Sequence, residues 1–111
     1  MADSDAALGE FEQMILLAVL CAQQDDGDAY GVTVHRALTR RTSRRIALGA
    51  VYMTLDRLEK KGLLSSTLSA PTAERGGRAK RCYAVTRRAK TALLASQRTL
   101  MRLWEGLEPS R

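Results

Sequence analysis

The first 62 residues contain three segments whose apolar side chains recur at helical spacing. Across Glu10 to about Gln24 these residues return every three or four positions, which predicts a helix with a wide apolar face. A second helix is expected from an N-cap at Asp28 to about Arg41, and a third from Leu48 to Lys61. Short polar turns separate the segments, so the chain is predicted to begin with three helices that pack on one another.

Two short strands are predicted after Gly62, which stands where the third helix needs a left-handed C-cap. Residues 63–68 and 82–86 are rich in apolar and β-branched side chains, a composition typical of strands. The segment between them, Ser69 to Lys80, contains Pro71, Gly76 and Gly77 and indicates a long hairpin loop. Three helices followed by a two-stranded hairpin, the wing, predict a mainly α (α+β) fold of the winged helix-turn-helix class.

The last helical segment, about Thr86 to Leu107, carries a seam that repeats every 3.5 residues. Its members lie at intervals of four, three, four, three and four: Ala89, Leu93, Ser96, Leu100, Leu103 and Leu107. Leu94, Met101 and Trp104 form a second apolar stripe beside this seam. A domain of this size cannot cover two adjacent faces of one helix, so one face is expected to pack on a second subunit.

A chain of 111 residues has room for one domain with one core. The expected organisation is a flexible N-terminus over residues 1–8, a winged-helix DNA-binding domain over 9–86, a C-terminal dimerisation helix over 87–107 and a tail over 108–111.

The basic residues are concentrated in one part of the chain. Residues 1–28 hold seven acidic side chains and no Lys or Arg, whereas the remaining 83 residues hold 18 basic and 5 acidic groups. This asymmetry indicates a polyanionic partner. Because the basic residues occur on several predicted elements rather than along one amphipathic helix, double-stranded DNA is favoured over a membrane surface.

The residue types that carry catalysis or bind metal do not form recognisable motifs. Cys21 and Cys82 lack a C-x-x-C or a neighbouring His, and the single histidine, His35, has no nucleophile at matching helical spacing. We therefore expect no enzyme activity, no metal and no cofactor. The longest apolar run, Met14 to Ala22, is too short for a membrane span and no basic region precedes it, so a cytoplasmic protein is expected.

The third helix is the candidate for contact with base edges, because the second helix of a helix-turn-helix lies in the major groove. If Leu48, Val51, Leu55 and Leu58 face the core, five residues face away from it: Gly49, Ala50, Met53, Thr54 and Arg57. Tyr52 borders the core stripe. Its hydroxyl is predicted either to reach a phosphate or base, or to remain solvated above a half-buried ring.

Two groups of cations flank this helix in the sequence and are predicted to contact phosphates, which positions a protein without selecting a sequence. The turn before it carries Arg40, Arg41, Arg44 and Arg45, for which a solvated basic turn is the alternative. The wing carries Arg75, Arg78, Lys80 and Arg81. A wing of this kind can lie along the phosphates or insert an arginine into the minor groove.

Four stretches of the sequence carry a family resemblance that covers about Gly9 to Ala95. They are the run Gly9–Leu17, the pair Tyr30–Gly31, the stretch Leu48–Leu64, and Gly76–Tyr83 leading into Thr86. With them the chain resembles the PadR family of bacterial transcription regulators, in its short form with a single C-terminal helix. Family members often have Pro at the positions of Met53 and Arg88. Neither change threatens the fold, but base preferences cannot be carried over.

The resemblance implies homodimerisation through the C-terminal helix with help from the N-terminal one, and usually repression of a nearby operon. The residues expected at the dimer interface are Phe11, Leu93, Leu100, Leu103 and Leu107. A planar small-molecule effector could stack on Trp104 in a pocket lined by Phe11, Leu100 and Met101, unless Trp104 is simply part of the dimer core. The competing function is a protein-interaction module that uses the C-terminal helix without binding DNA.

Overall fold

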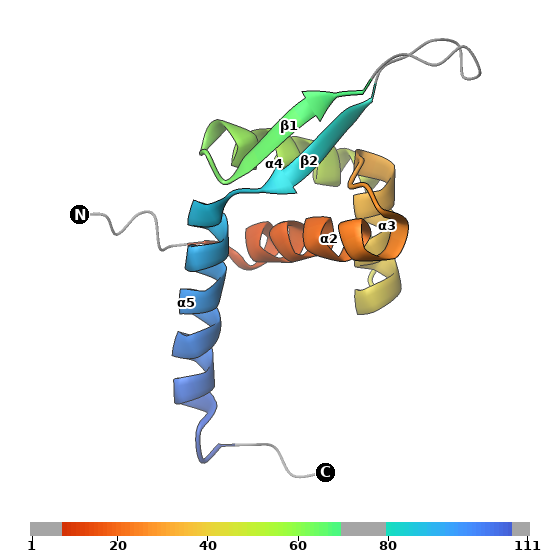
Figure 1. Ribbon diagram of the computed structural model, residues 1–111. Helices are drawn as coiled ribbons and strands as arrows, with labels where there is room; N and C mark the ends of the chain where they lie inside the picture. The colour runs from red at the N-terminus through yellow and green to blue at the C-terminus, as the bar shows by residue number, and fades with distance from the viewer. Residues whose placement is uncertain (1–7, 70–79, 108–111) are drawn as a thin grey trace.

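The computed structural model describes residues 8–69 and 80–107 (Figure 1). In these residues the elements follow in the order α2 (Glu10–Asp26), α3 (Gly31–Thr42), α4 (Leu48–Lys60), β1 (Leu64–Leu68), β2 (Arg81–Val85) and α5 (Arg87–Trp104). This is the order that the sequence predicts, and the two strands pair antiparallel as a wing. The predicted mainly α (α+β) winged-helix architecture is therefore confirmed.

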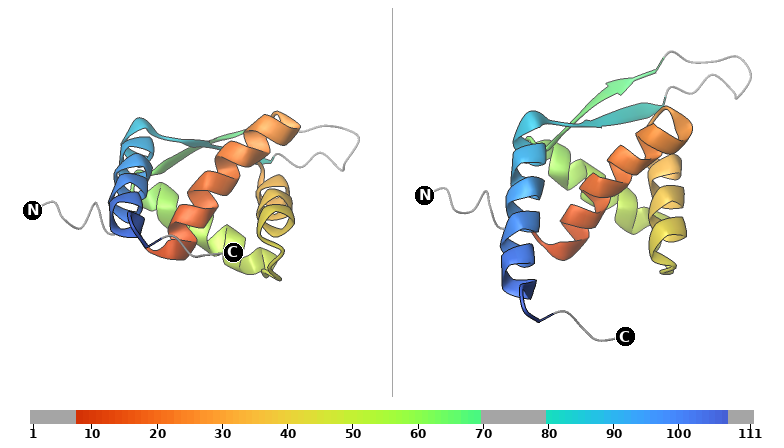
Figure 2. Two further views of the ribbon diagram at one scale, coloured as in Figure 1. Left: turned by 90° about the horizontal axis from the view of Figure 1, so that it is seen from below. Right: turned by 60° about the horizontal axis from the view of Figure 1, so that its bottom comes forward.

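The core lies where α2 crosses the other helices. In both views of Figure 2, α2 runs between α5 at one end and α3 at the other, with α4 beside it. The largest fully buried side chains come from α2, α3 and α4: Ile15, Leu16, Val19, Val34, Val51, Leu55 and Leu58. Leu64, Tyr83 and Val85 of the wing close the core from the side of the sheet.

Helix α3 begins later than the sequence predicts, with Tyr30 rather than Asp28 as its N-cap. The carbonyl of Ala29 accepts a hydrogen bond from the backbone N–H of Tyr83 at 2.8 Å, and Tyr30 forms an antiparallel bridge with Cys82. The segment before α3 therefore pairs with β2 as a short third strand. The N–H of Tyr30 donates to the Thr33 hydroxyl at 2.9 Å, which caps the helix at this later position.

The wing is closed next to its loop by Ser69 and Lys80. The N–H of Ser69 donates to the Lys80 carbonyl at 2.7 Å, and the N–H of Lys80 donates to the Ser69 hydroxyl at 3.0 Å. In the two-stranded sheet, Leu64 pairs with Val85 at one end and Leu68 pairs with Arg81 at the other. Strand β1 thus begins at Leu64, one residue after the position expected from the sequence.

Hydrogen bonds join the start of α5 to the C-terminal end of α4. The Thr86 hydroxyl is the N-cap of α5, accepting from the N–H of Ala89 at 3.2 Å and donating to the Gly62 carbonyl at 3.0 Å. Gly62 has a φ of 79°, as predicted for the C-cap of α4. Arg88, which stands where the family often has Pro, donates to the Lys61 carbonyl at 3.1 Å. The residue therefore helps to hold the C-terminal end of α4.

Only the first two turns of α5 pack on the protomer's own core. Ala89 and Leu93 are buried, and the Ser96 hydroxyl donates to the side-chain carbonyl of Gln13 on α2 at 2.9 Å. Leu93, expected at the dimer interface, is 8% exposed in the single protomer and already belongs to its core. The prediction for Leu93 needs this correction because the upper part of the seam faces α2, whereas the lower part extends beyond it (Figure 1).

A buried carboxylate connects α2 to α4. Glu12 is 8% exposed, and its Oε2 accepts from the Lys61 ammonium at 2.8 Å and from Arg57 Nε at 3.3 Å. Burial by itself would raise the pKa of Glu12, but the hydrogen bonds from Lys61 and Arg57 outweigh it and hold that pKa below its ordinary value. The ion cluster of Glu12, Arg57 and Lys61 therefore fixes the orientation of α4 on α2.

Replacing this carboxylate tests the cluster. We expect Glu12→Gln to lower the free energy of unfolding at pH 7 by about 1–3 kcal/mol, because Arg57 and Lys61 lose a charged acceptor. A carboxyl whose pKa is lowered by folding stabilises the folded state above its unfolded pKa of about 4.3, and this contribution is lost as the pH falls through the folded pKa. Urea unfolding at several pH values should therefore show the variant and the parent converging in acid.

The matched control is Glu10→Gln, two residues away on the same helix. Glu10 is exposed and makes only a 4.0 Å ion pair with Arg44, so its replacement should change the unfolding free energy by less than about 0.5 kcal/mol. Equal losses in the two variants, or a loss for Glu12→Gln that does not depend on pH, would contradict the assignment.

Candidate nucleic-acid interface

Helix α4 has one buried and one exposed face. Val51, Thr54, Leu55 and Leu58 face the core. Four exposed residues outside this buried face occur three, one and three residues apart: Gly49, Tyr52, Met53 and Asp56. We call these four residues the α4 stripe. It runs along the first two turns of the helix, and Met53 is 69% exposed.

Thr54 and Arg57 were expected to face away from the core; the structure contradicts this for Thr54, whereas Arg57 is exposed as expected. Thr54 is 3% exposed, because it lies three residues from Val51 and four from Leu58 and so shares their face. The guanidinium of Arg57 is turned to Glu12 and approaches the Thr54 hydroxyl at 3.5 Å. Thr54 is therefore unavailable to contact bases, whereas the Arg57 side chain is 50% exposed and pairs with Glu12.

The N-terminal end of α4 also differs from expectation. Leu48 was assigned to the core, but it is 40% exposed because it occupies the first turn, beyond the neighbouring helices. Ala50, expected to face away from the core, is only partly exposed. Gly49 is exposed, and a Cβ added there would meet no atom within 4 Å. The exposed start of α4 thus combines Leu48, Tyr52 and Met53.

Tyr52 is held in place by Gly31 of α3. A Cβ on residue 31 would approach three atoms of the Tyr52 ring and hydroxyl to less than 3.0 Å, closer than side chains tolerate. Only glycine allows the ring to lie against the start of α3 in this way. Tyr52 nevertheless remains 43% exposed, so its ring is both packed and available at the surface.

The turn that leads into α4 presents cations at the surface. Ser43 adopts a left-handed conformation, with a φ of 57°, and Arg44 and Arg45 that follow it are exposed. His35 Nε2–H of α3 donates to the Ile46 carbonyl at 2.6 Å, which ties the turn to α3. A shallow depression of about 400 Å³ lies here, lined by His35, Thr39, Ser43, Arg44, Arg45 and Ile46.

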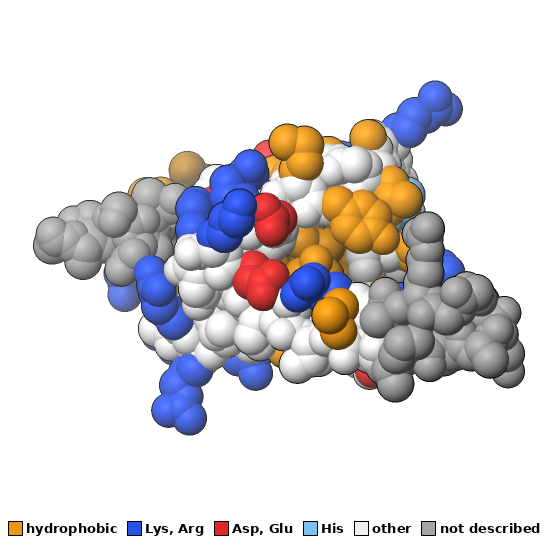
Figure 3. Space-filling model, turned by 90° about the horizontal axis from the view of Figure 1, so that it is seen from above, with side chains coloured by type: hydrophobic (Ala, Val, Ile, Leu, Met, Phe, Trp, Pro, Cys, Tyr) orange, Lys and Arg blue, Asp and Glu red, His pale blue; other side chains and the backbone are white. Residues whose placement is uncertain are grey.

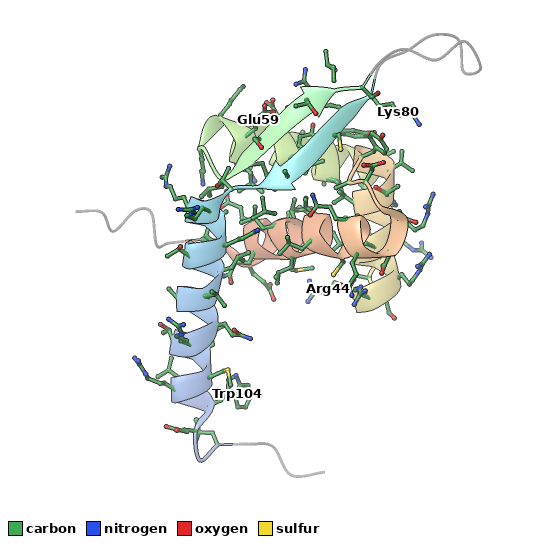
Figure 4. The ribbon with its side chains drawn as sticks, viewed as in Figure 1. Arg44, Glu59, Lys80 and Trp104 are labelled. Carbon is green, nitrogen blue, oxygen red and sulfur yellow. The ribbon has the colours of Figure 1, made fainter. Side chains whose placement is uncertain are left out.

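The wing presents a second pair of cations. The Lys80 ammonium lies 5.5 Å from the centroid of the Tyr30 ring, and Figure 4 shows Lys80 at the end of β2 next to the loop. Arg81 donates to the Ser66 hydroxyl at 2.9 Å, and Ser66 in turn donates to Glu59 at 2.7 Å. Arg75 and Arg78, the other two predicted wing cations, lie outside the described residues.

The exposed apolar and basic side chains are segregated on the surface. On the face seen in Figure 3, hydrophobic side chains gather toward the loop between the strands, and many of the visible Lys and Arg side chains gather toward the other end. Cations and apolar side chains thus occupy different parts of this face. This distribution separates groups that can contact phosphates from groups that can contact base edges.

A second exposed surface lies on the lower half of α5. The apolar seam begins with Ala89 and Leu93, which are buried, and continues with Leu100, Leu103 and Leu107, which are exposed. The residues of the second apolar stripe are exposed beside it: Leu94, Met101 and Trp104. Figure 4 shows Trp104 near the end of the helix, on the side toward which α2 extends. Leu17 of α2 is exposed as well, beside an apolar groove of about 130 Å³ between α2 and α3. Contiguous apolar surface of this kind indicates an interaction site.

The residues predicted to line an effector pocket lie on different elements. Phe11 packs against the core from the first turn of α2, whereas Leu100, Met101 and Trp104 are exposed at the end of α5. One protomer therefore leaves Trp104 uncovered.

Sequence reasoning overlooked three features of this surface. Glu12 was counted only among the acidic residues, although its spacing from Ile15 and Leu16 places it on the buried face. The contact between Gly31 and Tyr52 was also overlooked, although a glycine at the start of α3 could have indicated a close approach by another residue. Leu17 belongs to an apolar run, and its exposure could not be derived from periodicity because nearly every neighbour is apolar too.

Two general properties hold over residues 8–69 and 80–107. No helix in this part is long and apolar enough to cross a membrane. The same part contains no group of three His, Cys, Asp or Glu side chains that could hold a metal ion. Cys21 and Cys82 are free thiols, both partly buried.

The model of the PadR-like family of transcriptional regulators matches residues 16–95 of this sequence. The chain belongs to the PadR-like family. Its fold is the DNA-binding winged helix of these transcriptional regulators. No curated protein matches the sequence.

Several solved structures share the PadR-like fold. A PadR-like transcription factor from Bacteroides fragilis is 21% identical, with a TM-score of 0.70 over 87% of this chain and 85% of that one. A PadR-like regulator from Bacillus cereus is also 21% identical, with a TM-score of 0.65 over 87% and 86%. The Orc1 protein of Aeropyrum pernix, solved in complex with DNA, is 18% identical, with a TM-score of 0.65 over 91% of this chain and 27% of that one.

The contact between Gly31 and Tyr52 generates a prediction for this PadR-like protein. Gly31→Ala should weaken binding to duplex DNA about five- to thirtyfold, because the added Cβ displaces the Tyr52 ring from its place beside the groove-facing surface. Fluorescence anisotropy with a labelled duplex measures the affinity. If Gly31 acts through Tyr52, the double variant with Tyr52→Ala should bind no more weakly than Tyr52→Ala alone.

Gly9→Ala is the control, since a Cβ at position 9 meets no atom within 4 Å. It should leave the affinity unchanged. If Gly31→Ala weakens binding as strongly in the Tyr52→Ala variant as it does in the parent, Gly31 does not act through Tyr52.

Proposed function

We propose that this PadR-like protein is a homodimeric repressor that binds a two-fold symmetric operator through α4 and the wing. The observation that carries the proposal is the arrangement around the α4 stripe. The helix face is exposed and partly apolar. Arg44 and Arg45 lie in the turn that leads into the helix, and Lys80 and Arg81 lie at the wing, where the Ser66 hydroxyl links Arg81 to Glu59 of α4. The opposite face of the same helix is fixed to the core by Leu55, Leu58 and the Glu12 ion cluster.

Each part of this arrangement suits a different part of duplex DNA. A helix fits the major groove, and the first turns of the recognition helix contact base edges. Arg and Lys on the adjoining turn and wing neutralise phosphates and release counterions. The Aeropyrum pernix Orc1 protein, part of which shares the fold of this chain, has been solved in complex with DNA. Because the proposed partner is chromosomal DNA, the proposed location is the cytoplasm.

The lower half of α5 supports the proposed homodimer. The seam of α5 is buried at Ala89 and Leu93 and exposed at Leu100, Leu103 and Leu107. The helix therefore offers an apolar surface that one protomer does not cover. A second copy presents the same surface and would bury both at once, as a two-fold interface requires. The two recognition helices of such a dimer would reach half-sites on the order of 34–36 Å apart or a multiple of that distance.

Repression follows from occupancy of the operator, since a bound dimer blocks access to the promoter. We further propose that a planar small molecule controls this occupancy by stacking on Trp104, with Phe11, Leu100 and Met101 nearby. The support is the exposed indole at the end of the proposed dimerisation helix. Trp104 is the only tryptophan of the chain, so its fluorescence reports binding of phenolic or planar cationic compounds directly.

The flanking cations should act on all sequences alike. The double variants Arg44→Ala with Arg45→Ala, and Lys80→Ala with Arg81→Ala, should bind every duplex more weakly. The slope of log affinity against log salt should fall by about 0.9 for each phosphate that the variant no longer neutralises. Affinities for several duplexes at a series of salt concentrations give both quantities.

Arg102→Ala serves as the control, because Arg102 is an exposed cation in the last turn of α5, at the end of the helix that lies away from α4 and the wing (Figure 1). It should leave the slope unchanged. Normal binding by both double variants would overturn the assignment of phosphate contacts. Binding to no duplex even at low salt would overturn the DNA-binding function itself and favour a protein-interaction module.

The dimer interface can be tested without unfolding the protomer. Leu100→Glu with Leu103→Glu should convert the dimer to monomers in analytical ultracentrifugation, because both side chains are exposed in the protomer and lie on one face. Ala95→Glu, on the other side of the same helix, should leave the dimer intact. Leu93→Ala should instead destabilise the protomer by about 2–5 kcal/mol, as a core truncation does. A dimer that survives the double substitution would refute this interface.

A further inference from the structure

The α4 stripe lacks the side chains that most often recognise purines. In the major groove Arg or Lys pairs with guanine, Asn or Gln pairs with adenine, and apolar groups contact the methyl group of thymine. Gly49, Tyr52, Met53 and Asp56 include none of the first four types. This inference rests on the proposed function, because it concerns what the stripe recognises once α4 lies in the groove.

The nearest cations of α4 are engaged within the protein. Arg57 is held by the Glu12 carboxylate through Nε at 3.3 Å. Lys60, one turn beyond the stripe, lies 3.1 Å from Asp56 across an i, i+4 pair. Asp56 has the wrong charge for the acceptor atoms of guanine and is suited to accept from the amino group of cytosine. The two helix cations next to the stripe thus already have carboxylate partners, although both side chains remain exposed.

Apolar groups take the place of these cations at the end of the helix that approaches the bases. Met53 is the most exposed side chain of this group; Tyr52 is its neighbour in the chain, and Leu48 lies one turn before Tyr52. Tyr52 is fixed against Gly31, whereas the unbranched thioether of Met53 can adapt to a neighbouring methyl group. Gly49 adds no side chain, so the backbone of the first turn can approach the groove closely.

We propose that this protein recognises its operator through the 5-methyl groups of thymine, with Met53 as the main contact and Tyr52 and Leu48 beside it. Contact with a thymine methyl buries apolar surface on both partners, and one buried methyl group corresponds to about a fourfold change in affinity. The affinity of the complex comes mainly from the phosphate contacts. The methyl contacts determine which sequence is preferred.

The experiment compares thymine with uracil, which lacks only the methyl group. A duplex selected from a random pool by the full chain is resynthesised with uracil at one thymine position of each half-site in turn. Affinity is measured by fluorescence anisotropy for the parent, Met53→Ala and Met53→Leu. At one or two positions the parent should bind the uracil duplex about fifteenfold more weakly, since one methyl group is removed from each of the two half-sites.

Met53→Ala should abolish most of this discrimination at one of those positions, and Met53→Leu should keep it, because leucine restores an apolar contact. All three proteins should show the same melting temperature, since position 53 is exposed and contributes little to the core. Discrimination at a thymine position that is unchanged in Met53→Ala would overturn the role of Met53. Equal affinity for thymine and uracil duplexes, or binding without sequence preference, would overturn the proposal while leaving DNA binding intact. Failure to bind any duplex at low salt would remove the proposed function and this inference with it.

Discussion

The rest of the structure depends on the burial of the apolar face of α2. Ile15, Leu16 and Val19 are fully buried where α3, α4 and β2 meet on this helix. Because protein interiors are closely packed, the position of α2 sets the positions of the elements around it. The Glu12 carboxylate adds direction to this packing, since it accepts from Arg57 and Lys61 and so permits one rotation of α4. The surface that α4 presents to its partner follows from these internal contacts.

The same internal contacts divide the cations into two groups. Arg57 and Lys61 are used within the fold, whereas Arg44, Arg45, Lys80 and Arg81 remain at the surface around α4. The net charge of the chain is therefore larger than the positive charge that is free to bind a polyanion near α4. In the proposed complex, long-range attraction to phosphates and discrimination between bases are properties of different residues, as in most proteins that bind duplex DNA.

Periodicity predicted the elements well because they are long and strongly patterned. It placed the start of α4 at Leu48 and the glycine C-cap at Gly62, and it anticipated that α5 carries more apolar surface than one small domain can cover. Thr54 was expected at the surface because its side chain is polar, although its spacing from Val51 and Leu58 places it on their buried face. The prediction failed at Asp28 because pairing of Ala29 and Tyr30 with β2 delays the start of α3. Contacts between residues far apart in the sequence leave no trace in local spacing.

The sequence by itself determined the order of the helices and strands, the apolar seam of α5 and the concentration of positive charge after residue 28. These properties depend on local spacing and on composition, which are present in the linear chain. Only the tertiary structure decided which side chains of α4 are available at the surface. Whether Arg57 faces DNA or Glu12, and whether Tyr52 is held by Gly31, depends on atoms more than 20 residues away that come together only in the folded core.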